Sequence, residues 1–114
     1  MKKLLHSFFF ALEGVISVFK TERNFRIETF AAWVVICLML YFPLTGLEIA
    51  VVSLAIASVL VMEILNTALE RLLDILTKRK SKNFKFLKDV MAAAVLLNSI
   101  GAVIVGIFIF GKYF

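Results

Sequence analysis

The chain has 114 residues, of which 62% are hydrophobic and 18% are charged, and its mean hydropathy is +1.00. A water-soluble domain of this length needs far more polar surface, so the composition excludes that class and predicts an all-α integral membrane protein forming one unit over residues 1–114. The formal net charge of +5 fits a membrane topology and anionic lipid headgroups, and it implies no nucleic acid partner.

The segment from about Leu4 to Lys20 has the periodicity of an amphipathic helix. Its polar residues repeat at helical spacing along one narrow stripe, while aliphatic and aromatic residues fill the remaining surface. This pattern predicts a helix lying in the membrane interface. A secretory signal peptide is the alternative reading, because two lysines precede the apolar stretch. Glu13 interrupts that stretch, however, and no small-residue cleavage site follows it.

Three later apolar stretches predict transmembrane helices at about 27–42, 47–65 and 90–110. A polar cluster at 21–26 separates the first from the surface helix, with Thr21 or Asn24 as a candidate helix cap. The run Pro43–Gly46 predicts a tight turn. The second helix should continue to about residue 77, roughly 45 Å in all, so its last third stands clear of the hydrocarbon core.

Basic residues indicate the orientation of these spans. Of the 13 Lys and Arg residues, all but Lys112 lie before the first span or between the second and third. The positive-inside rule therefore predicts a cytoplasmic N-terminus and a C-terminus outside. Within the third span, Asn98 and Ser99 are expected to form interhelical hydrogen bonds.

The polar end of the second helix carries the residues that indicate chemistry. Glu63, Asn66, Glu70 and Asp74 fall within about 80° of one another on a helical face. Carboxylates at the cytoplasmic interface, with Lys88 nearby, suit a magnesium–nucleotide complex. Against this, the sequence lacks the glycine-rich P-loop pattern. A solvated helix end with ordinary acids remains the alternative from the residues alone.

Three stretches resemble one known family. The run Glu63–Asp74, which reads EILNTALERLLD, is similar to the signature of the small bacterial diacylglycerol kinases, a family that includes undecaprenol kinase. The run TERNF at 21–25 and Lys88-Asp89, followed by AAAV at 92–95, match its other characteristic stretches. The resemblance implies a homotrimeric enzyme of the bacterial cytoplasmic (inner) membrane that transfers the ATP γ-phosphate to a lipid alcohol.

The resemblance also implies roles for particular residues. Glu63 is the expected catalytic carboxylate and contacts the lipid substrate, with Asn66 as its supporting polar group. Glu22 and Glu70 are the expected Mg²⁺ ligands. The same resemblance implies that ATP contacts Glu22, Glu70, Lys88 and Asp89.

Other polar residues receive no catalytic role. Asp74 is interpreted as structural, and Arg23, Arg26 and Glu28 as interfacial anchors. The basic connector at 78–87 departs from the family pattern, so no ATP contact is assigned to it. Undecaprenol and diacylglycerol both remain candidate substrates. The TERNF sequence and the Asn-Thr-Ala sequence slightly favour undecaprenol.

Two alternatives from other functional classes stay open at this point. A small proton-coupled transporter could use Glu63 as its intramembrane acid. A non-enzymatic membrane subunit would need the acidic face only for contacts with a larger partner. A transporter has no evident need for the grouping of Glu70, Asp74 and Lys88 on the cytoplasmic side.

Overall fold

The computed structural model describes residues 1–76 and 82–114, and in these ranges all regular structure is helical. The helices are α1 (Lys2–Thr21), α2 (Arg23–Tyr41), α3 (Gly46–Leu76) and α4 (Lys82–Phe110), followed by the short 3₁₀ helix η1 (Gly111–Tyr113). Each of the four long helices therefore contains a segment that the sequence predicted as helical. Residue 77, the expected end of the second helix, lies outside the described residues.

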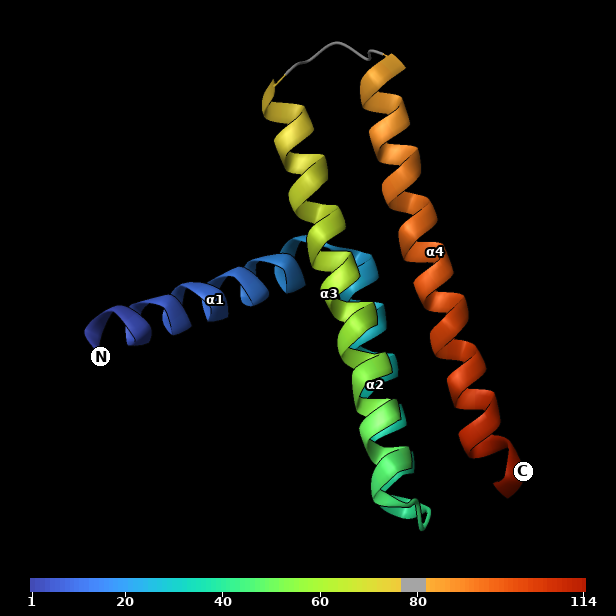
Figure 1. Ribbon diagram of the computed structural model, residues 1–114. Coiled ribbons are helices and arrows are strands. Elements are labelled where there is room, and N and C mark those ends of the chain that lie inside the picture. Colours follow the sequence, from blue (N-terminus) through green and yellow to red (C-terminus); the bar gives the residue numbers. More distant parts are fainter. Residues whose placement is uncertain (77–81) are drawn as a thin grey trace.

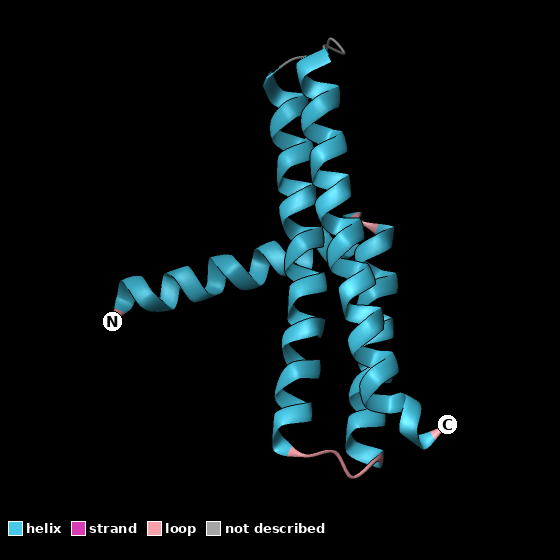
Figure 2. Cartoon of the chain, turned by 45° about the vertical axis from the view of Figure 1, so that its right-hand side comes forward, coloured by secondary structure: helices cyan, strands magenta, loops and turns pink. Residues whose placement is uncertain are grey.

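Three of the long helices stand side by side, and the fourth projects sideways from them. In Figure 1, α2, α3 and α4 run along the long axis of the molecule, whereas α1 projects away from them. Figure 2 shows the same arrangement from a second direction, with α3 and α4 both continuing past the level of α1. α3 packs along both α2 and α4. The late part of α3 and the early part of α4 therefore extend beyond the junction of α1 and α2.

The break between α1 and α2 is a single extended residue. Glu22 has φ −113° and ψ 112°, which interrupts the helical path. The sequence proposal that Thr21 or Asn24 caps α2 is wrong, because Glu22 occupies the cap position and makes no side-chain cap bond. The Thr21 hydroxyl instead donates to the Ser17 carbonyl at 2.8 Å.

Arg26 ties the two helices together at this break. Its Nη1 donates to the carbonyl oxygens of Phe19 and Lys20, at 2.8 and 3.0 Å. Carbonyls in the last turn of a helix have no intrahelical partner, and a basic side chain commonly satisfies them. This contact is more specific than the interfacial anchoring expected from the sequence, and it fixes the direction in which α1 leaves α2.

The turn between α2 and α3 forms where Pro43–Gly46 predicted it. Thr45 and Glu48 make a capping box: the Thr45 amide donates to Glu48 Oε1 at 3.0 Å, and the Glu48 amide donates to Thr45 Oγ1 at 3.2 Å. Lys112 pairs with Glu48 Oε2 at 2.7 Å, and the Tyr113 ring stacks on Phe42 with centroids 4.5 Å apart. These contacts join the end of α4 to the α2–α3 turn.

The exposed surface has the character of an integral membrane protein. In the described ranges 1–76 and 82–114, four helices are long and apolar enough to cross a membrane, α1 among them. Among the described residues, the buried apolar side chains are those of Phe25, Val52, Leu73 and Phe110, whereas many large apolar side chains are exposed. Apolar surface this extensive requires contact with lipid or protein. α1 itself buries none of its residues.

One side-chain hydrogen bond joins α3 and α4 where their apolar surfaces pack together. Asn98 Nδ2 donates to Ser58 Oγ at 3.2 Å, and Ser58 donates in turn to the Ala55 carbonyl at 2.8 Å. The predicted interhelical bond of Asn98 is therefore confirmed. In apolar surroundings such a bond fixes the register of two helices, because sliding would leave the amide without a partner.

We predict that Asn98→Ala and Ser58→Ala each lower the thermal stability of the protein in detergent. Their effects should be non-additive, with a coupling free energy of about 0.6 kcal/mol, the average for such bonds in membrane proteins. A double-mutant cycle measured by thermal unfolding tests this. Ser53→Ala, on the exposed side of α3, is the matched control and should change little. Additive effects would contradict the bond.

Candidate functional site

The acidic face of α3 lies where α3 meets the junction of α1 and α2. Glu63 is the central residue and only 5% of it is exposed. Its carboxylate interacts electrostatically with those of Glu22 and Glu70, and Glu28 of α2 interacts with Glu63. The fold therefore brings together the three acids Glu22, Glu63 and Glu70 that the sequence singled out. Glu28, which the sequence assigned to membrane anchoring, joins them.

Glu22 is held at the rim of this site by an arginine. Arg71 Nη2 lies 3.2 Å from Glu22 Oε1 and also donates to Thr21 Oγ1 at 3.2 Å. The Glu22 side chain is 27% exposed and that of Arg71 is 56% exposed. The pair connects the α1–α2 junction to α3, and it leaves the Glu22 side chain partly exposed.

The two polar residues that follow Glu63 on α3, Asn66 and Thr67, have different hydrogen-bond partners. Asn66 Nδ2 donates to Glu70 Oε1 at 3.4 Å, so the amide supports Glu70 in this structure. Thr67 is buried and donates to the Glu63 carbonyl at 3.0 Å. Glu63 thus lies on the buried side of α3, while Glu70 lies about two turns further along the same helix.

Lys88 and Asp89 face different neighbours. Lys88 Nζ lies 3.8 Å from Asp74 Oδ1 across α3 and α4, and Asp89 pairs with Lys85 at 2.7 Å within α4. Successive residues of a helix point about 100° apart, which is why these two neighbouring residues have different ion-pair partners in this structure. The contact of Lys88 with Asp74 does bring the start of α4 to the acidic face of α3.

The carboxylates fit a magnesium ion that shares its ligands with a nucleotide. In the described part of the chain, no group of three or more His, Cys, Asp or Glu side chains is close enough to hold a metal by itself. Mg²⁺ in nucleotide sites typically takes one or two carboxylates and completes its coordination with water and phosphate oxygens. Glu22 and Glu70, which both interact electrostatically with Glu63, would be that smaller number of ligands.

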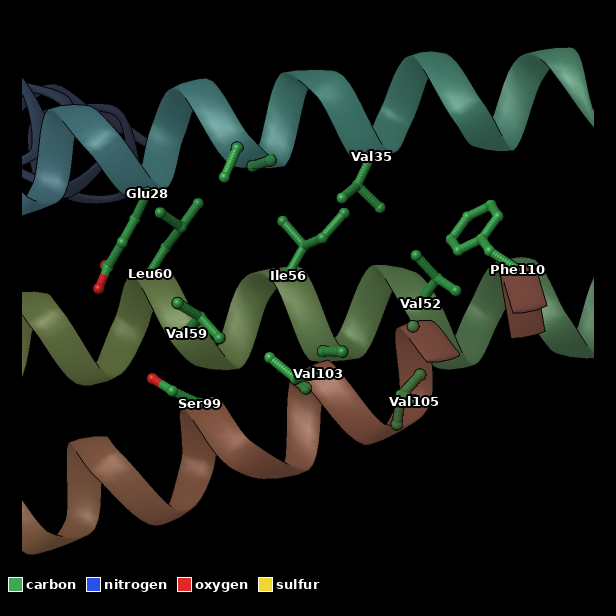
Figure 3. A pocket seen from close by; sticks show the side chains of 15 residues that line it. Glu28, Val35, Val52, Ile56, Val59, Leu60, Ser99, Val103, Val105 and Phe110 are labelled. Atoms are coloured by element: carbon green, nitrogen blue, oxygen red, sulfur yellow. The ribbon is translucent and has the colours of Figure 1, made fainter. Parts of the chain in front are cut away.

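An apolar groove begins beside the acidic cluster and runs along the membrane part of the molecule. It has a volume of about 340 Å³ and is lined by α2, α3 and α4. Figure 3 shows Glu28 at one end, pointing from α2 into the space beside Leu60, and Phe110 at the other. Glu28 Oε2 is buried and has no hydrogen-bond partner within the described chain. A buried carboxylate oxygen without a partner is costly, so this position suits a ligand with a hydroxyl group.

Comparison with known proteins identifies the chain's family. A family model described as prokaryotic diacylglycerol kinase matches residues 9–110. That match covers α1 from Phe9 onward and all of α2, α3 and α4. The chain belongs to the prokaryotic diacylglycerol kinase family.

Individual members of the diacylglycerol kinase family are similar over most of this chain. A diacylglycerol kinase of Synechocystis sp. is 43% identical over 104 residues, which cover 90% of this chain and 59% of that relative. An undecaprenol kinase of Bacillus subtilis is 31% identical over 110 residues, 96% of this chain and 89% of the relative. A diacylglycerol kinase of Haemophilus influenzae is 32% identical over 94 residues, which cover 82% of this chain and 80% of that relative.

These relatives confirm the resemblance recognised in the sequence. Their names support a lipid kinase, and the four long apolar helices agree with a membrane protein. The chain spans less than two thirds of the cyanobacterial diacylglycerol kinase's length.

Two residues of this site were not assigned to it from the sequence. Glu28 lies 35 positions before Glu63 and on another helix, so periodicity gave no reason to connect the two. Arg71 follows Glu70 directly, and the sequence offered no partner for it. The capping box at the opposite end of α3, by contrast, does have a sequence signal, because Thr45-x-x-Glu48 has the required spacing.

Proposed function

We propose that this protein is an ATP- and Mg²⁺-dependent kinase that phosphorylates a membrane lipid alcohol at the cytoplasmic face of the bacterial inner membrane. One observation carries the proposal: the buried Glu63 lies between surface carboxylates on one side and the head of an apolar groove on the other. A lipid kinase needs that arrangement, because its two substrates arrive from water and from the bilayer.

The donor side consists of the groups nearest the aqueous end of α3. Glu22 and Glu70 would hold Mg²⁺ together with the phosphates of ATP. The ion, when bound, would neutralise charge on the transferred phosphoryl group. Lys88 contacts the acidic face through Asp74, so its ammonium group can pair with phosphate there. Asp89 stays in the proposal through the family resemblance alone.

The acceptor side is the groove. Its volume of about 340 Å³ falls in the range of ligand sites, and its lining between Glu28 and Phe110 is almost wholly apolar, as an acyl or prenyl chain requires. With the chain in the groove, the lipid hydroxyl lies at the Glu28 end, near Glu63. The unpartnered Glu28 oxygen can then accept a hydrogen bond from the lipid headgroup.

Glu63 would act as the general base. Its carboxylate takes the proton of the lipid hydroxyl as that oxygen attacks the γ-phosphorus, and the bond from the γ-phosphorus to the bridging oxygen of ADP breaks. Asn66, one turn from Glu63 and bonded to Glu70, would link the acceptor and donor sides. The products are the lipid phosphate and ADP.

The assembly and orientation belong to the same proposal. α1 would lie in the cytoplasmic interface, with the spans at 27–42, 47–65 and 90–110 and the C-terminus outside. Its direction across the other helices supports this placement. The chain would form a homotrimer, which would also cover part of its exposed apolar surface. Undecaprenol and diacylglycerol are both candidate acceptors.

A phosphotransfer assay on the purified protein tests the function directly. With radiolabelled ATP and Mg²⁺, we expect a labelled lipid phosphate from undecaprenol or diacylglycerol, and ceramide serves as a third acceptor. In sealed vesicles, added ATP should be used only by the inside-out population. Absence of transfer to every lipid alcohol would refute the kinase, leaving a transporter or a non-enzymatic subunit.

The metal assignment is tested by removing one carboxylate at a time. We predict that Glu22→Gln and Glu70→Gln each raise the Mg²⁺ and ATP concentrations needed for half-maximal activity, because a neutral amide binds a hard cation poorly. Titrations of metal at fixed ATP, and of ATP at saturating metal, measure both. Glu13→Gln, on exposed α1, is the control. Unchanged requirements in both variants would rule out the assignment.

The role of Glu63 is tested by Glu63→Gln, which keeps the side-chain shape and removes the base. We predict that kcat falls by about 10²–10⁴-fold while binding of ATP changes little. The alternative is a structural role for the buried carboxylate. In that case the variant would lose stability or assembly but keep its turnover per folded molecule. Near-normal kcat in well-folded protein would exclude the base role.

A further inference from the structure

Arg71 is a charged residue of the site to which the proposed reaction gives no part. It follows Glu70 on α3, and its guanidinium bonds Glu22 Oε1 and Thr21 Oγ1 at 3.2 Å each. Glu22 is also one of the two carboxylates that the proposed function assigns to Mg²⁺. The arginine and the cation would therefore use the same carboxylate.

The two partners exclude each other for electrostatic reasons. A divalent cation at Glu22 competes for the oxygen that accepts from the guanidinium, and the two positive charges repel each other. The Arg71 side chain is 56% exposed, and ion pairs this exposed are weak. The guanidinium can therefore leave Glu22 without disturbing the packing of α3.

We propose that Arg71 exchanges partners during nucleotide binding. In the nucleotide-free protein it pairs with Glu22, and when Mg–ATP binds it moves to the phosphate oxygens that arrive with the metal. Its planar guanidinium can bond two phosphate oxygens at once, and its position next to Glu70 keeps it within the same site. The inference rests on the proposed function and adds a phosphate-contacting residue to it.

The exchange predicts that Arg71→Gln changes metal affinity and nucleotide affinity in opposite directions, and both affinities can be measured without catalytic turnover. Arg71→Gln should bind Mn²⁺, a spectroscopic substitute for Mg²⁺, about two- to fivefold more tightly in the absence of nucleotide, because a weak competitor has gone. The same variant should bind a non-hydrolysable ATP analogue with Mg²⁺ about tenfold more weakly, because a charge-assisted hydrogen bond is lost. Electron paramagnetic resonance measures the first affinity and equilibrium dialysis the second.

Two further variants keep the test interpretable. Arg23→Gln removes the same charge from an exposed residue next to Glu22 and should change both affinities less than twofold. Arg71→Lys keeps the charge but not the planar fork, so it should retain near-normal Mn²⁺ affinity and bind the analogue with intermediate strength. It also serves if Arg71→Gln does not fold.

The outcomes separate this inference from the proposed function. If Arg71→Gln weakens both affinities, or changes neither, Arg71 has a structural role only and the exchange is wrong. If Glu22→Gln leaves Mn²⁺ affinity unchanged, the metal assignment itself fails. Loss of Mn²⁺ affinity in Glu22→Gln together with opposite shifts in Arg71→Gln supports both.

Discussion

The length of α3 is the constraint on which the site depends. Its 31 residues extend about 46 Å, against roughly 30 Å for the hydrocarbon core of a bilayer. One continuous helix is thus long enough to cross the membrane and to carry Glu63, Glu70 and Asp74 toward one of its ends. Because no glycine or proline interrupts α3 between Leu47 and Leu76, the acids keep a fixed relation to the apolar groove.

The other helices give that end of α3 its surroundings. α1 leaves the bundle at Glu22, so the bend that turns α1 aside also brings the Glu22 carboxylate to α3, where Arg71 holds it. α2 contributes Glu28 at the head of the groove. α4 contributes Lys88, which contacts Asp74. The break between α1 and α2, the helix α2 and the helix α4 thus each bring one charged group to the acidic face of α3.

Like charges in this region need compensation. Glu22, Glu28 and Glu70 each repel Glu63 electrostatically, and clustered acids are unfavourable unless a cation accompanies them. Arg71 supplies part of that charge at Glu22. Under the proposed function, a metal–nucleotide complex would supply more.

The sequence by itself determined the membrane class, the four long helices, the turn at Pro43–Gly46 and the family, because composition, helical period and contiguous motifs are local properties. It also placed Glu63 and Glu70 on one face of α3. Only the tertiary structure decided that Glu28 joins Glu63, that Arg71 holds Glu22, and that Lys88 and Asp89 face different neighbours. Those contacts depend on how separate helices pack and rotate about their axes, and periodicity within one helix does not encode its rotation relative to another.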